Sequence, residues 1–140
     1  MCTCNQCDLN FVLSSSVQNS REIEPFSVFL IHLHYHSLGT LLTLEYLDAS
    51  QEKDWKTIAK RVVSASQNMA LDPPLVLKGG DRLKATCHYN SVNRTTATLF
   101  GFDAFTEEMC NVFLMSFGKL STPVYWGNAG ETNGEVLPRK

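Results

Sequence analysis

Long apolar runs, an excess of basic residues and a leader-like start are all missing from this sequence. Charged residues make up only 19% of the 140 residues, and the net charge at pH 7 is −2. A basic surface for nucleic acid or for an acidic membrane is therefore not expected. No apolar run approaches the roughly 18 residues that cross a bilayer, and residues 1–7 lack the charged and apolar regions of a signal peptide. Any signal peptide or membrane anchor is expected to lie outside this chain.

Several enzyme motifs are also absent. The sequence contains no P-loop, no dinucleotide-binding fingerprint, no nucleophile elbow and no internal repeat. Hydrophobic residues make up 44% of the chain, which is typical of a globular protein. A chain of this length is predicted to form one compact unit that buries about two-thirds of its unfolded surface.

The pattern of β-forming residues predicts the fold class. Such residues recur between turn signals about every 8 to 12 positions, which indicates an all-β fold, an antiparallel β-sandwich or jelly roll. Residues 1–24 are expected to form a cysteine-containing N-terminal segment with an edge strand, residues 25–117 the sandwich, and residues 118–140 a loosely ordered tail. The expected strands cover residues 8–13, 26–36, 40–47, 75–77, 82–89, 95–100 and 110–117.

The segments between these strands carry further predictions. Strands 26–36 and 40–47 are separated only by Ser37-Leu38-Gly39, so they are expected to pair as antiparallel neighbours. The apolar spacing of residues 55–63 favours a helix, and residues 64–74, which end in Asp-Pro-Pro, are expected to be a loop. Residues 103–109 are expected to hold one helical turn.

Three of the five cysteines crowd the start of the chain. Cys2, Cys4 and Cys7 form a Cys-x-Cys-x-x-Cys pattern, which is compatible with a thiolate metal site. No fourth ligand lies nearby in the sequence, so unpaired or disulfide-linked cysteines are the favoured interpretation.

Three of the four histidines alternate along one predicted strand. His32, His34 and His36 would line one face of it, and the other face would carry Phe29, Ile31, Leu33 and Tyr35. Imidazoles two residues apart project in parallel, at about 7 Å between Cα atoms, and can reach one metal ion. Imidazole suits zinc, copper, iron and nickel. The alternative is a partly exposed strand whose rings only form hydrogen bonds.

The second half of the chain resembles a known family. Its motifs are a Gly-Asp strand that ends in Cys87-His88-Tyr89-Asn90 and a later Glu108-Met109-Cys110, preceded in the chain by His34-Tyr35-His36-Ser37-Leu38-Gly39. In order and spacing, residues 26–117 resemble the C-terminal domain of copper type II, ascorbate-dependent monooxygenases, a family that includes dopamine β-hydroxylase and the peptide-amidating enzymes. The Cys-x-Tyr-Asn and Glu-Met-Cys elements carry most of this resemblance.

The resemblance implies a copper site in which His34, His36 and Met109 are the ligands and dioxygen is activated. Two imidazoles bind either copper oxidation state, and a thioether favours Cu(I). From the residues alone, Met109 would be interpreted as a core methionine. Glu107 and Glu108 are expected to be solvated charges that flank the ligand.

The resemblance also implies roles for several other residues. Cys87 and Cys110 would form a disulfide, which requires an oxidising compartment. The sequon at Asn93 fits the same secretory setting. Asn111 and Phe113 would border the substrate pocket, and ascorbate would be the electron donor in the full-length family enzymes.

Several positions depart from the family pattern. His32 stands where the peptide-amidating members carry an arginine, so the match is closer to the dopamine β-hydroxylase-like group. Thr40 replaces a common basic residue, residues 64–75 lack a Tyr-Ser-Pro-like segment, and a cysteine expected after the last strand is missing. The family's second copper, held by three histidines of a preceding domain, has no counterpart here, where His88 is the only histidine outside residues 26–36.

Three hypotheses follow from the sequence. The first is the oxygen-activating domain of a copper monooxygenase that hydroxylates an aliphatic C–H bond of a small amine-like molecule, as a partial enzyme without the electron-transfer domain. The second is a non-catalytic copper-binding or interaction module. The third is a zinc-binding sandwich that uses His32, His34 and His36 without Met109.

Overall fold

The structure, a computed structural model, describes residues 6–12, 24–51, 53–117, 131–132 and 135–136. Every regular element in these ranges is a β-strand, and no helix occurs among them. The strands are β1 (Gln6–Val12), β2 (Phe26–Tyr35), β3 (Gly39–Leu47), β4 (Lys56–Val62), β5 (Asn68–Leu77), β6 (Arg82–Tyr89), β7 (Cys110–Phe117), β8 (Glu131–Thr132) and β9 (Glu135–Val136). The predicted all-β class is confirmed.

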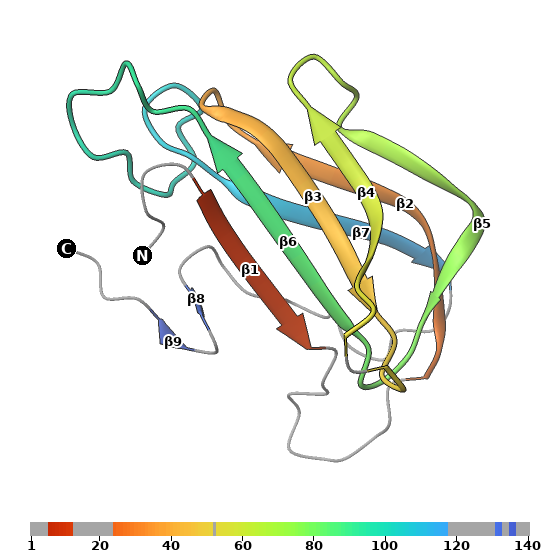
Figure 1. Cartoon of the computed structure of the whole chain (residues 1–140). Coiled ribbons are helices and arrows are strands. Elements are labelled where there is room, and N and C mark those ends of the chain that lie inside the picture. The colour runs from red at the N-terminus through yellow and green to blue at the C-terminus, as the bar shows by residue number, and fades with distance from the viewer. Residues whose placement is uncertain (1–5, 13–23, 52, 118–130, 133–134, 137–140) are drawn as a thin grey trace.

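Two antiparallel sheets form the body of the molecule (Figure 1). One has the strand order β1-β6-β3-β4, and the other has the order β5-β2-β7. The core lies between them and is filled by fully buried side chains from both sheets, among them Val28, Ile31, Leu33, Leu42, Leu44, Leu77, Leu83 and Ala85. The arrangement is the predicted antiparallel β-sandwich.

The histidine strand β2 contains a bulge. The pairing of β2 with both neighbours shifts between Val28 and Leu30, so Phe29 is an extra residue in the ladder. Phe29 therefore leaves the core face on which the alternation placed it, and its ring stacks on Phe117 with 4.3 Å between centroids. The expected burial holds beyond the bulge, where Ile31, Leu33 and Tyr35 are buried.

The connection from β2 to β3 crosses between the sheets. The prediction that these two strands pair as neighbours is wrong, because β2 pairs with β5 and β7 whereas β3 pairs with β4 and β6. Both strands have one buried face, and that pattern fits a crossing as well as a hairpin. The turn is fixed from the other sheet, since the Asn90 N–H donates to the Leu38 carbonyl at 2.8 Å.

The segment predicted as a helix is the edge strand β4. Its pairing with β3 shifts after Leu44, so that Ala59 lies opposite Leu44 and Thr57 lies opposite Glu45, which leaves Ile58 unpaired. This bulge places two apolar residues in succession and makes a strand sequence resemble a helical stripe. Arg61 of β4 lies over the Tyr35 ring, 3.8 Å from its centroid.

The segment predicted as a loop lies largely within β5. This strand continues through Asp72-Pro73-Pro74, with a cis bond before Pro73. The prolines are accommodated because β5 is the edge of its sheet and residues 71–74 have no partner in its pairing with β2. The Asp-Pro-Pro sequence, which predicted the end of a loop before a short strand, therefore lies inside a strand.

Most other expectations about strands agree with the structure. β1 is an edge strand, as predicted, and it belongs to the four-stranded sheet; β6 and β7 have the predicted bounds. Residues 95–100 do not form a strand, since their only β-type contact is a bridge from Phe100 to Glu108. At residues 103–107 the chain makes a single turn, closed by Glu107 N–H to the Asp103 carbonyl at 2.9 Å. Most of the predicted tail lies outside the described residues.

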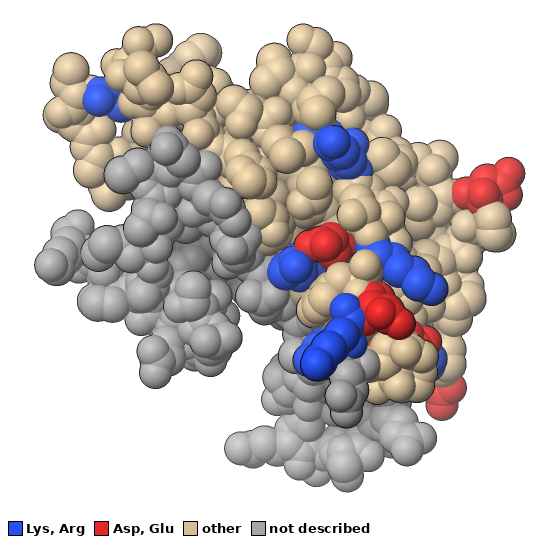
Figure 2. Space-filling model, in the orientation of Figure 1, with Lys and Arg blue, Asp and Glu red and all other residues tan. Residues whose placement is uncertain are grey.

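Charges on the viewed face are mixed. Figure 2 shows Lys and Arg side chains next to Asp and Glu side chains on the outside of the four-stranded sheet, and two contacts account for part of this pattern. Lys84 Nζ forms a salt bridge with Glu45 Oε2 at 2.7 Å, and Lys78 Nζ forms one with Asp48 Oδ2, also at 2.7 Å. The described residues contain no helix that could span a membrane.

Candidate metal centre

Three histidines lie on the outer face of the sheet β5-β2-β7. They alternate with buried Ile31 and Leu33, and each is partly exposed. The rings of His34 and His36 are close, with 5.1 Å between centroids and an edge-to-face arrangement. The His32 ring is nearly parallel to that of His34 at 6.1 Å. His34 and His36 therefore form the closer pair.

Hydrogen bonds orient the rings of this pair. His36 Nδ1 lies 2.9 Å from the carbonyl oxygen of Glu107, and His34 Nδ1 lies 3.1 Å from Oε1 of Gln67. Both partners are oxygen atoms, so these contacts are hydrogen bonds in the tautomer whose proton is on Nδ1. In a neutral ring this leaves the Nε2 lone pair free, which is the tautomer that metal-ligating histidines adopt.

The thioether of Met109 is held on the same face. Met109 directly precedes β7, where Asn111 lies opposite His34 in the strand pairing. The Asn111 side-chain amide donates to Met109 Sδ at 3.2 Å. Because cross-strand partners share one face of a sheet, this contact places the sulfur on the side of the sheet that carries the histidine pair.

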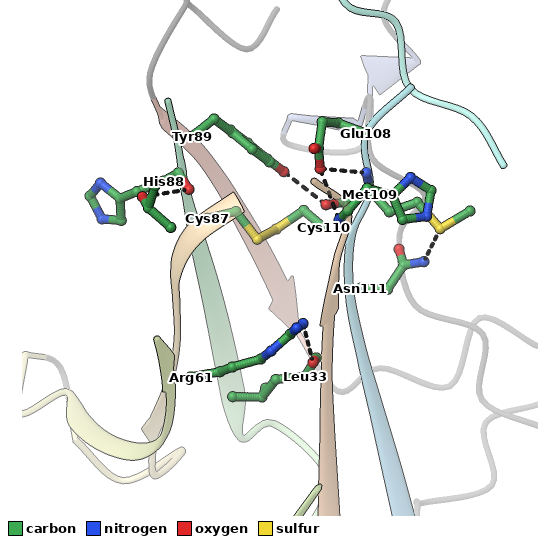
Figure 3. Close-up of a disulfide and its surroundings, with 11 residues drawn as sticks. Leu33, Arg61, Cys87, His88, Tyr89, Glu108, Met109, Cys110 and Asn111 are labelled. Atoms are coloured by element: carbon green, nitrogen blue, oxygen red, sulfur yellow. Dashed lines mark hydrogen bonds between the residues drawn. A yellow bond between two sulfur atoms is a disulfide. The ribbon is translucent and has the colours of Figure 1, made fainter. Parts of the chain in front are cut away.

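The backbone around Met109 is fixed from the other sheet (Figure 3). The next residue, Cys110, is bonded to Cys87 of β6 with an S–S distance of 2.05 Å, so the predicted disulfide is present. The Tyr89 hydroxyl donates to the Met109 carbonyl at 3.0 Å. Burial and the nearby Glu108 carboxylate raise the pKa of Tyr89, which keeps this hydroxyl protonated as a donor.

Glu108 does not behave as the sequence suggested. It was expected to be a solvated charge, but it is buried, with 5% of its surface exposed. Its carboxylate accepts the backbone N–H of His36 at 3.0 Å, that of Leu38, and that of Met109 at 3.3 Å. Glu107 matches the expectation better, since its carboxylate accepts the Asp103 N–H in an exposed position.

A glycine is required next to this turn. A Cβ on Gly39 would lie 2.0 Å from Cδ2 of Tyr35 and 2.3 Å from Cγ, well inside contact distance. Tyr35 is buried and lies opposite Cys110 in the pairing of β2 with β7. The glycine after the histidine pair therefore lets the chain turn across the Tyr35 ring.

Two imidazoles and a thioether form a donor set that suits copper, and the thioether favours Cu(I). A scan against protein-family models matches residues 5–128 to the family described as copper type II ascorbate-dependent monooxygenase, C-terminal domain. The chain belongs to this family. The resemblance inferred from the sequence is thus confirmed, and copper and ascorbate are the cofactors that the family name gives. No curated protein matches the sequence.

Within this monooxygenase domain His32 resembles the pair in one respect, because its Nδ1 also lies near a side-chain acceptor, Oδ1 of Asn68 at 2.7 Å. Its position differs, since its ring is 6.1 Å from that of His34 and is tilted against Phe113 with 5.6 Å between centroids. Among the described residues, no group of three His, Cys, Asp or Glu side chains is arranged to hold a metal ion. A site made of His32, His34 and His36 alone, as the zinc hypothesis requires, is therefore not assembled here.

The remaining candidates are dispersed. His88 alternates with the buried residues of β6 and points away from Met109 in Figure 3. Asn111 and Phe113 lie on the histidine face, and Asn93 is exposed in a turn. Cys2 and Cys4 lie outside the described residues, and only the backbone of Cys7 is described, so neither the favoured interpretation of unpaired or disulfide-linked cysteines nor the thiolate site is tested.

Sequence reasoning missed the residues that hold the ligands in place. The acceptor Gln67 lies in a segment without a motif, Tyr89 entered only as part of a family motif, and Glu108 was expected to be solvated. A glutamate directly before a candidate ligand was the available signal, but nothing in one sequence distinguishes a buried carboxylate from a solvated one.

Proposed function

We propose that this domain is the oxygen-activating copper domain of an ascorbate-dependent monooxygenase, with His34, His36 and Met109 as the copper ligands. The observation that supports the proposal is a pair of adjacent imidazoles whose Nδ1 atoms lie near oxygen acceptors, on the same face of the sheet as Asn111, whose amide donates to the Met109 thioether. Copper bound there would supply the dioxygen chemistry that inserts one oxygen atom into a C–H bond. The Nδ1 acceptors keep both imidazoles in the ligating tautomer.

The substrate is proposed to be a small amine-like molecule with an aliphatic C–H bond, as in the dopamine β-hydroxylase-like group. His32 occupies the place of the arginine of the peptide-amidating members, so a carboxylate anchor of that kind is missing. Phe113 and Asn111 lie on the same face as the proposed ligands and offer one apolar and one amide contact. Both are proposed to border the substrate.

A second copper domain is proposed as the partner that delivers electrons from ascorbate. Its place is suggested by the outer side of β7, where three large apolar side chains are exposed: Phe113 at 53%, Met115 at 49% and Phe117 at 61%. These three side chains lie on the same face of the sheet as the histidines of β2. A domain docked on this stripe would stand beside the copper ligands.

A secretory or extracellular location is proposed for the protein. A disulfide between Cys87 and Cys110 is stable in an oxidising compartment, and the exposed turn at Asn93 suits a glycan.

Copper K-edge X-ray absorption of the Cu(I)-loaded chain tests the ligand set. The wild type is expected to show nitrogen scatterers and one sulfur scatterer, and Met109→Ile should lose the sulfur. Met115→Ile is the matched control, because Met115 is an exposed methionine on the same face of the sheet. A sulfur signal that survives in Met109→Ile, or that is missing from the wild type, would refute the proposed site.

The alternative function is a copper-binding module without catalysis. A non-catalytic module would give the same X-ray absorption result, so the two functions are distinguished by measuring whether the protein turns over a substrate. The monooxygenase proposal expects ascorbate- and oxygen-dependent hydroxylation of an amine substrate once the chain is joined to a three-histidine copper domain.

A further inference from the structure

The buried carboxylate of Glu108 connects two segments that lie far apart in the sequence. Oε2 accepts the N–H of His36 at 3.0 Å across 72 residues, and Oε1 accepts the N–H of Leu38 across 70 residues. Oε2 also accepts the N–H of Met109 at 3.3 Å. One side chain thus holds the backbone of one proposed ligand, His36, together with that of another, Met109.

The neighbouring backbone reinforces this connection. The Glu107 carbonyl accepts from His36 Nδ1, and the Glu108 N–H donates to the Leu99 carbonyl at 2.9 Å. Glu107 and Glu108 therefore contact the turn after β2 through a backbone carbonyl and a carboxylate. The two segments are 70 or more residues apart in the sequence, so without such contacts a metal ion would have to order both of them as it binds.

We infer that Glu108 is a positioning residue that assembles the two halves of the copper site before the metal binds. This inference rests on the proposed ligand role of His34, His36 and Met109. The carboxylate suits the task because both of its oxygens accept hydrogen bonds from backbone N–H groups, and such charge-assisted bonds are about twice as strong as neutral ones. Burial excludes water as a substitute partner for these N–H groups.

Glu108→Gln is the variant that isolates this role. The change keeps the size of the side chain, but one of its two terminal atoms becomes an NH2 group. Both oxygens of Glu108 accept from N–H groups, so the new NH2 must face at least one donor and leave that donor unpaired. The proposed copper ligands themselves are unchanged.

The matched control is Glu107→Gln, one residue away. The Glu107 carboxylate accepts the Asp103 N–H at 3.0 Å in an exposed position, while its contact with His36 is made by its backbone carbonyl. The control therefore removes the same charge one residue away and leaves the hydrogen bonds of the Glu108 carboxylate intact.

Competition of the full chain with a chromophoric Cu(I) chelator measures the affinity. Glu108→Gln is expected to bind Cu(I) about 10- to 100-fold more weakly, which is the usual effect of removing a partner that orients metal ligands. Glu107→Gln should stay within about twofold of the wild type, as is usual for surface substitutions. Equal affinities for Glu108→Gln and the wild type would overturn the inference.

Amide hydrogen exchange of the metal-free wild type tests the same point without any variant that must fold. The N–H groups of His36, Leu38 and Met109 are expected to be protected before copper is added. Protection that arises only after Cu(I) binding would also overturn the inference. A wild type without a copper–sulfur signal would refute the proposed function. Protected amides in that same sample would still show that Glu108 holds the two segments together without metal.

Discussion

Cys87 and Cys110 join the two sheets of the sandwich by a disulfide. Cys87 lies in β6 of the four-stranded sheet and Cys110 begins β7 of the three-stranded sheet, so the bond spans the core. Both residues are buried, at 0% and 2% exposure. Because Met109 immediately precedes Cys110, the cross-link also fixes where the chain presents the proposed thioether ligand.

Removing this disulfide should weaken both the fold and the copper site. The bridged residues are separated by 23 positions, and closing a loop of that size stabilises a fold by roughly 3 kcal/mol. The double variant Cys87→Ser/Cys110→Ser is expected to lose about that much free energy of unfolding in urea. The intensity of the copper–sulfur signal should fall in the same variant. Unchanged urea midpoints would contradict this account.

Of the four histidines, only His34 and His36 should contribute to the stabilisation of the wild-type fold by copper. A ligand at 100 times its Kd adds about 2.7 kcal/mol to the free energy of unfolding. Thermal unfolding with and without Cu(I) should show this increase in the wild type and in His88→Ala, since His88 lies in the other sheet. The increase should be lost in His34→Ala.

His32→Ala separates the two possible histidine sets. If the ligands are His34, His36 and Met109, the copper-dependent stabilisation persists in this variant. Its loss there, combined with its persistence in Met109→Ile, would favour a three-histidine site and contradict the proposed one.

The sequence was sufficient to predict the strands and their faces where the alternation is regular. His32, His34 and His36 share a face because β2 has no bulge after Leu30. β6 and β7 were found with their bounds because their apolar alternation ends at clear turns. The family resemblance then grouped Met109 with the histidines as a ligand, a prediction that no local sequence pattern contains.

The remaining features depend on partners that lie far away in the sequence. Bulges beside Phe29 and at Ile58 change the side-chain period by one residue, and one sequence does not reveal where a neighbouring strand imposes them. The crossing of β2 to β3 depends on Glu108, which lies 70 residues from Leu38. Whether a carboxylate is buried is decided by such distant contacts, and so its role was mispredicted.

Gly39→Ala should be destabilising because of one specific contact. The added methyl group would lie 2.0 Å from the Tyr35 ring, and overpacking of this kind costs about 1–3 kcal/mol. Urea unfolding measures the loss. Tyr35→Ala in the same chain removes Cγ and Cδ2, the two atoms nearest to the methyl group, so the double variant is expected to be less destabilised than the sum of the single variants. Simple additivity would contradict the predicted clash.

Tyr89→Phe should change the response of the fold to alkaline pH. Burial, together with the Glu108 carboxylate, raises the pKa of Tyr89 in the folded state. The folded chain then holds this proton at pH values where the unfolded chain, with a tyrosine pKa of about 10, has lost it. Stability due to this group is therefore fully present below pH 10 and falls as the pH rises above it, by up to about 1.4 kcal/mol per pH unit.

Urea unfolding between pH 9 and pH 11.5 gives the slope. Tyr89→Phe should be less stable at pH 7, because the hydrogen bond to the Met109 carbonyl is gone, and should lose stability less steeply above pH 10. The pKa of Tyr46 is also raised, by burial and by Asp81 and Asp48, so Tyr46→Phe serves as a comparison with no contact to Met109. An unchanged slope in Tyr89→Phe would contradict the assignment.

The sequon at Asn93 should carry a glycan when the chain passes through a secretory pathway. Asn93 is exposed in a turn that is closed by the Arg94 N–H to the Ser91 carbonyl at 2.9 Å, so an attached sugar would meet solvent and no packed side chain. Expression behind a heterologous signal peptide should give a product whose electrophoretic mobility increases after treatment with an N-glycosidase. Asn93→Gln and Thr95→Ala should both abolish this shift, whereas Asn90→Gln, which lies outside the sequon, should retain it. A wild-type product without the shift would remove the glycan from the proposal, and the secretory assignment would then rest on the buried disulfide alone.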